Sequence, residues 1–68
     1  MRPISGKRPR RILERRGWVL VDTSGSHHKF RSPDGTRTTI IPIHGNHDLK
    51  PGTQRSIMKD AGLDEGDL

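Results

Sequence analysis

The heptapeptide Gly-Ser-His-His-Lys-Phe-Arg, at residues 25–31, organises this chain because it predicts a short strand with two different faces. Successive side chains of a strand point to opposite sides, so His27, Lys29 and Arg31 share one face. Phe30 lies on the other face, and as the only phenylalanine of a chain poor in apolar residues it is expected in the core. The stretch therefore predicts a sheet with a core on one side and His27 on an open side, next to two cations.

His27 is a candidate acid/base residue. Imidazole is the one side chain whose unperturbed pKa lies near neutrality, so it takes and returns a proton at physiological pH without help from burial. Lys29 and Arg31, on the same face, favour an anion beside it. This pattern predicts proton transfer next to an anionic group.

The length of 68 residues predicts one domain, 1–68, with an ordered core over residues 4–63 and a frayed acidic tail over residues 64–68. A domain of this size buries only about 60% of its extended-chain surface. Apolar residues make up 26% of the chain and cysteine is absent, so neither disulfides nor cysteine-ligated zinc can stabilise it. Nearly every large apolar residue must therefore contribute to the core.

No apolar run approaches the roughly 20 residues that a membrane span needs, and no hydrophobic segment follows the basic N-terminus as in a signal peptide. A cytoplasmic protein without a membrane partner is the expectation. The net charge of +5 is uneven: residues 1–16 carry +6, residues 17–58 carry +2 and residues 59–68 carry −3. A basic body with an acidic end suits a polyanion such as nucleic acid, although a solvated charged surface would look the same.

The first element expected is a helix after an unstructured lead at residues 1–4. Ser5 is a candidate N-cap, Pro9 suits the first turn, and Gly17 predicts a left-handed stop. Pro9, Ile12 and Leu13 lie on one side at helical spacing. The arginines on the other side could either follow a phosphate backbone or simply be solvated.

Three strands and a second helix follow. The strands are expected at residues 18–23, 26–31 and 36–43, because these runs are β-branched or alternating and short turn sequences separate them. Pro42 implies a strand end or a sheet edge. Pro51 suits a first helical position before a helix over residues 52–61, which Gly62 closes.

These elements predict an α+β fold of order α-β-β-β-α. The short connections make the three-stranded antiparallel sheet a meander, in which the strand that carries His27 lies in the middle. Both helices are expected on one face of the sheet, because the apolar residues are too few to bury two faces.

Seven blocks of sequence carry a resemblance to a known family. They are GWVLV at residues 17–21, GSHHKF at 25–30, PDG at 33–35, IPIHG at 41–45, LKPGT at 49–53, SI at 56–57 and AGL at 61–63. In this order and spacing the chain resembles the HicA toxins of bacterial type II toxin–antitoxin pairs, over roughly residues 4–66. It departs from the family's usual residues at Pro9, Arg10, Ser32 and Gln54, which puts core packing in question more than the His27 segment.

The resemblance implies a fold like that of double-stranded-RNA-binding domains and an mRNA interferase activity that needs no metal. It implies as partner the HicB antitoxin, which occludes the active site. The family's catalytic histidine maps onto His27, and His28 remains an alternative because some members carry it one place later. The chain is thus expected to bind RNA and not, by itself, DNA.

The mechanism expected from these residues is removal of the ribose 2′-OH proton by His27, followed by attack on the adjacent phosphorus. Lys29 is the first candidate to stabilise the phosphoryl charge. The proton returned to the leaving group could come from His28, His44 or water. The candidate RNA contacts are Gly25, Ser26, His28, Lys29, Arg31 and Arg37.

Other interpretations remain at this stage. A non-catalytic RNA-binding module of the same fold would fit the basic helix, and so, less well, would a DNA-binding protein that uses its arginines. Four histidines without cysteine or a well-placed carboxylate make a poor zinc site, so no metal or other cofactor is expected. Trp18 could stack on a base but is expected to be structural.

Overall fold

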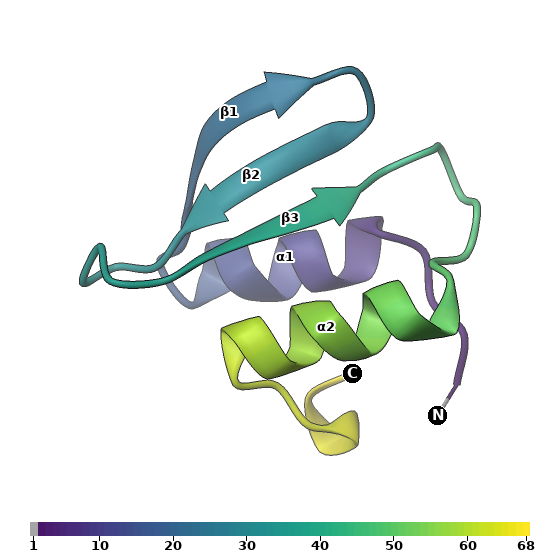
Figure 1. Cartoon of the computed structure of the whole chain (residues 1–68). Helices are drawn as coiled ribbons and strands as arrows, with labels where there is room; N and C mark the ends of the chain where they lie inside the picture. The colour runs from purple at the N-terminus through teal and green to yellow at the C-terminus, as the bar shows by residue number, and fades with distance from the viewer. Residues whose placement is uncertain (1) are drawn as a thin grey trace.

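The computed structural model describes residues 2–68. The elements are α1 (Lys7–Arg15), β1 (Val19–Ser24), β2 (His27–Arg31), β3 (Thr38–Pro42), α2 (Pro51–Ala61) and a short 3-10 helix, η1 (Glu65–Asp67) (Figure 1). The predicted α+β fold of order α-β-β-β-α is confirmed. The third strand is shorter than expected, because Thr36 and Arg37 belong to the turn that precedes it.

The sheet is antiparallel with the order β1-β2-β3, so the strand that carries His27 lies in the middle. Phe30 pairs with Leu20 on β1 and with Thr39 on β3. The register between β1 and β2 shifts by one residue between Leu20 and Asp22, which makes Val21 the extra residue of a β-bulge. On both sides of this bulge, the β1 residues that pair with the open-face residues of β2 lie on the open face as well.

Both helices cover the same face of the sheet, as predicted, and leave the other face open (Figure 1). Phe30 and Ile41 are fully buried against the helices, whereas Lys29 and Ile40, one position away on each strand, are exposed. The core consists of Ile4, Leu13, Trp18, Phe30, Ile41, Leu49, Ile57, Ala61 and Leu63. The alternation of side chains along β2 thus separates the core from the candidate site.

Helix α1 has Gly6 at its N-cap, so the expectation that Ser5 would cap it was wrong. Ser5 instead forms a β-bridge with Asp48, and a Cβ atom on Gly6 would lie 2.3 Å from the carbonyl oxygen of Pro42. The start of α1 is therefore packed directly against the end of β3. At the other end, Gly17 has φ +88° and ends the helix as predicted.

Residues 2–4 belong to no helix or strand, as expected, but they are attached to the rest of the fold, while Met1 lies outside the described residues. Ile4 is buried, and its carbonyl accepts a hydrogen bond of 2.8 Å from the Leu49 backbone N–H. The buried side chain of Gln54 donates to the Arg2 carbonyl at 2.8 Å and accepts from the Ile4 N–H at 3.4 Å. This glutamine therefore holds the N-terminal segment on α2.

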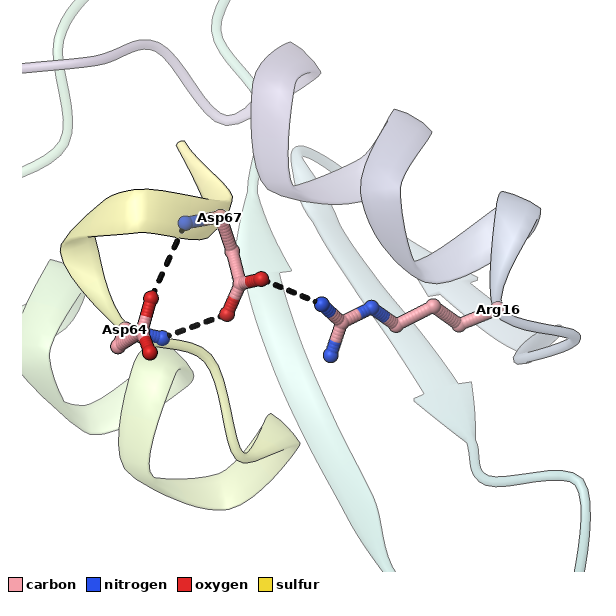
Figure 2. Close-up of polar contacts among 3 residues, drawn as sticks. All are labelled: Arg16, Asp64 and Asp67. Carbon is pink, nitrogen blue, oxygen red and sulfur yellow. Dashed lines mark hydrogen bonds and ion pairs between the residues drawn. The ribbon is translucent and has the colours of Figure 1, made fainter.

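The prediction that α2 begins at Pro51 and ends at Gly62 is confirmed, with Gly62 at φ +67°. The expectation of a frayed acidic end was wrong, because residues 65–67 form η1. The Asp64 and Asp67 side chains accept hydrogen bonds from each other's backbone N–H, and Asp67 forms a 2.7 Å ion pair with Arg16 (Figure 2). Arg8 also donates to the Leu68 carbonyl. The acidic end is thus held by the basic helix.

The turn between β2 and β3 is built around one carboxylate. Asp34 accepts hydrogen bonds from the Ser32 hydroxyl at 2.6 Å, the Thr36 hydroxyl at 2.8 Å and the Thr36 backbone N–H at 3.0 Å. These donors, the Ser32 hydroxyl first, lower the pKa of Asp34 from 3.8 to about 2. Ser32 therefore organises this turn.

Candidate active site

His27 begins β2, immediately after the tight turn that joins β1 to β2. Only Gly25 and Ser26 separate Ser24 from His27, so the turn has two residues. Gly25 adopts φ +58°, and glycine is favoured at this position because two-residue hairpin turns need a positive φ there. His27 is exposed, and it pairs with Ser24 on β1 and Pro42 on β3. Its position on the open face was predicted, and its exposure allows contact with a large ligand.

Two cations share this open face. Lys29 and Arg31 are both exposed and follow His27 at two-residue intervals along β2. Asp22 pairs directly with Lys29 across β1, so one negative charge lies beside the lysine. The face therefore presents one imidazole and two cations in a line along the middle strand, with a single carboxylate at its side.

Two of the predicted RNA contacts lie away from this line. The His28 side chain is half-buried on the helix side of the sheet, and its Nδ1–H donates to the Ser26 carbonyl at 2.8 Å. The Arg37 guanidinium lies over the buried Trp18 ring, 5.9 Å from the ring centre. A Cβ atom on Gly62, at the end of α2, would lie 3.8 Å from this guanidinium. The structure thus groups Lys29 and Arg31 with His27, but not His28 or Arg37.

A pocket of about 400 Å³, which no sequence pattern indicated, adjoins His27. Its walls come from β2, the end of β3, the loop after β3 and the start of α2. The lining residues are His27, Pro42, His44, His47, Asp48, Leu49, Lys50 and Thr53. Of the loop residues, the sequence singled out His44 alone, as one of three possible proton sources. The predicted hairpin register could have indicated that His44 continues β3 past His27.

The second pocket, of about 350 Å³, lies between β3 and α2 and has a different chemistry. Threonine, serine and isoleucine side chains dominate its walls together with Asp60, whose carboxylate accepts a 3.3 Å hydrogen bond from Thr39. Neither a histidine nor a cation lines it. Acid/base chemistry on an anionic ligand therefore fits the pocket beside His27 and not this one.

Within residues 2–68, no group of three or more His, Cys, Asp or Glu side chains is arranged to hold a metal ion. In the same part of the chain, no helix is long and apolar enough to cross a membrane.

The match to known families defines the class of protein. Residues 6–63 match the family described as HicA toxin of bacterial toxin-antitoxin systems, which are pairs of a toxin and the protein that neutralises it. No curated protein matches the chain. Because the match spans α1, the whole sheet and α2, the chain belongs to the HicA toxin family. Membership implies an antitoxin partner.

Proposed function

We propose that this chain is an endoribonuclease that cuts mRNA, with His27 as general base and without a metal ion. The observation that carries the proposal is the exposed imidazole on the open face of the middle strand, in line with Lys29 and Arg31. Membership of a toxin family supports it, because cutting mRNA would stop growth. The cytoplasm, where mRNA is translated, is the proposed location.

The reaction would begin at the ribose hydroxyl. Neutral His27 takes the proton of the 2′-OH, and the oxygen attacks the adjacent phosphorus and displaces the 5′-oxygen of the next nucleotide. The products are a 2′,3′-cyclic phosphate and a 5′-hydroxyl end. A positioned general base contributes roughly 10²- to 10⁴-fold to the rate. Because the route needs the 2′-OH, the substrate is RNA and not DNA.

The cations on the same face would act on the phosphate. Lys29 lies two residues from His27 on β2, so it can approach the phosphoryl oxygens on which negative charge grows during attack. Arg31 lies further along the strand and would hold a neighbouring phosphate of the same backbone. We propose that the antitoxin, of the HicB type, neutralises the toxin by covering this open face.

The test compares the purified chain with its His27→Ala variant on labelled RNA in the presence of a chelator. We expect the unchanged chain to cut the RNA and to leave the matching DNA intact, and we expect His27→Ala to lose at least roughly 10²-fold in rate. Arg55→Ala is the control, since Arg55 is an exposed cation on α2. It should cut at the normal rate, and circular dichroism should be the same for all three proteins.

Two outcomes would contradict the proposal. Full activity of His27→Ala would remove the assigned base. RNA that is bound and shifted in a gel but never cut would favour the non-catalytic RNA-binding module. Expression in a bacterium gives an independent readout, because growth arrest by the unchanged chain and not by His27→Ala is expected.

A further inference from the structure

The backbone ladder between β2 and β3 continues beyond the last assigned strand residue. His27 pairs with Pro42, and the next residue, Ile43, donates its N–H to the Ser26 carbonyl at 2.8 Å. Side chains alternate along an extended chain, so His44 follows Pro42 on the open face and is the diagonal neighbour of His27. Such diagonal pairs lie roughly 7–8 Å apart, within reach of two large side chains.

The pocket gives an independent observation of the same pair. His27 and His44 both line the cavity of about 400 Å³, together with one cation, Lys50, and one carboxylate, Asp48. This volume accommodates a phosphate group with part of a nucleoside. Two imidazoles that face one cavity can act on opposite sides of a bound phosphate.

The loop that carries His44 forms one hydrogen bond within itself and contacts two other segments of the chain. The His47 N–H donates to the His44 carbonyl at 2.9 Å, and the Lys7 ammonium donates to the Asn46 side-chain oxygen at 3.1 Å. Beyond the turn, Asp48 forms the β-bridge with Ser5. These contacts connect the loop to α1 and to the N-terminal segment on the far side of the turn from His44.

We propose that His44 is a second catalytic residue, the general acid that protonates the leaving 5′-oxygen. The inference rests on the proposed ribonuclease function. As the imidazolium, His44 gives one proton to the 5′-oxygen while the P–O5′ bond breaks, and His27 gains one proton from the 2′-OH while the P–O2′ bond forms. The free enzyme returns to its starting state when water carries a proton from His27 back to His44.

The position of His44 suits the role of proton donor better than the positions of His28 and His47. The His28 ring lies on the helix side of the sheet, and its Nδ1–H is already donated to Ser26. His47 also lines the pocket, but it follows the turn and is not part of the extended segment opposite His27. The test therefore includes His47→Ala beside His44→Ala.

The experiment uses two versions of one short oligoribonucleotide that contains a cleavage site mapped with the unchanged chain. The first version is ordinary RNA, and in the second a sulfur replaces the 5′-oxygen at the cleaved bond. A thiolate leaves without being protonated, so its departure needs no general acid. We expect His44→Ala to cut ordinary RNA roughly 10²- to 10⁴-fold more slowly than the unchanged chain and to regain most of this rate on the sulfur substrate.

The matched variants make each outcome decisive. His27→Ala should stay slow on both substrates, because the sulfur does not replace the base. His47→Ala should have the same rate relative to the unchanged chain on both substrates, because His47 gives no proton to the leaving group. The inference is overturned if His44→Ala cuts ordinary RNA normally, if it is equally slow on both substrates, or if His47→Ala alone shows the rescue. If no cleavage site can be mapped with the unchanged chain, the proposed ribonuclease function itself fails. Unchanged circular dichroism and melting temperature establish that His44→Ala is folded.

Discussion

Gly6 and Gly52 both lie at the start of a helix but have opposite surroundings. Gly6, at φ −62°, has backbone angles that any residue adopts, yet a Cβ atom there would meet the Pro42 carbonyl oxygen at 2.3 Å. A Cβ atom on Gly52 would meet nothing within 4 Å. The requirement for glycine at position 6 therefore comes from the packing of α1 against β3 and not from the backbone.

We predict that Gly6→Ala lowers the free energy of unfolding by about 1–3 kcal/mol, because α1 or the end of β3 must move to accept the methyl group. Gly52→Ala should leave the stability unchanged or raise it by up to about 1 kcal/mol, since alanine favours the helix. Urea denaturation of the two variants measures both effects. Equal stabilities would mean that the contact between α1 and β3 is not rigid.

At the scale of elements, the turn between β2 and β3 depends on the ionised form of Asp34. Its three hydrogen-bond donors, two from Thr36 and one from Ser32, stabilise the carboxylate and lower its pKa from 3.8 to about 2. The pKa of Asp67 in η1 is also lowered, first by the hydrogen bond from the Asp64 backbone. Both carboxylates therefore favour folding when they are ionised.

The sign of the pH dependence follows from the lowered pKa of Asp34. Its contribution to stability is fully present above pH 3.8, the ordinary value, and is lost as the pH falls toward about 2. We predict that Asp34→Asn lowers the melting temperature at about pH 5 and that the difference from the unchanged chain shrinks toward pH 2. Thermal unfolding at several pH values measures this. A difference that stays constant from pH 5 to pH 2 would contradict the prediction.

For the molecule as a whole, the two layers separate two groups of basic residues. Lys29 and Arg31 lie on the open face of the sheet, whereas the arginines of α1 belong to the helix layer on its other side (Figure 1). Part of the positive charge in and next to α1 is already neutralised within the molecule, because Arg16 forms an ion pair with Asp67. An RNA on the open face would therefore contact few of the helix arginines.

We predict that Lys29→Ala weakens RNA binding and that Arg11→Ala, an exposed cation of α1, does not. Binding is measured in the His27→Ala background, so that the RNA stays intact, at several salt concentrations. Loss of one phosphate contact should reduce the slope of log affinity against log salt by roughly 0.7 for single-stranded RNA. If Arg11→Ala reduces the slope and Lys29→Ala does not, the RNA follows the helix instead.

The elements of this fold could be predicted from short stretches of sequence because their causes are local. The alternation at residues 25–31 placed Phe30 in the core and His27 on the open face, and glycines placed the ends of both helices. The family match could likewise be anticipated from the order and spacing of short blocks. These features depend on residues only a few positions apart.

The sequence by itself thus determined the element order, the middle strand and the exposed His27. Only the tertiary structure decided that His44 lies in one pocket with His27, that Gln54 holds the N-terminal segment, and that the acidic end docks on α1. The physical reason is the sequence separation of the partners. Gln54 and Arg2 are 52 positions apart, and Arg16 and Asp67 are 51 positions apart. Such contacts form only when the helices pack on the sheet, so they cannot be predicted from the local periodicity of the sequence.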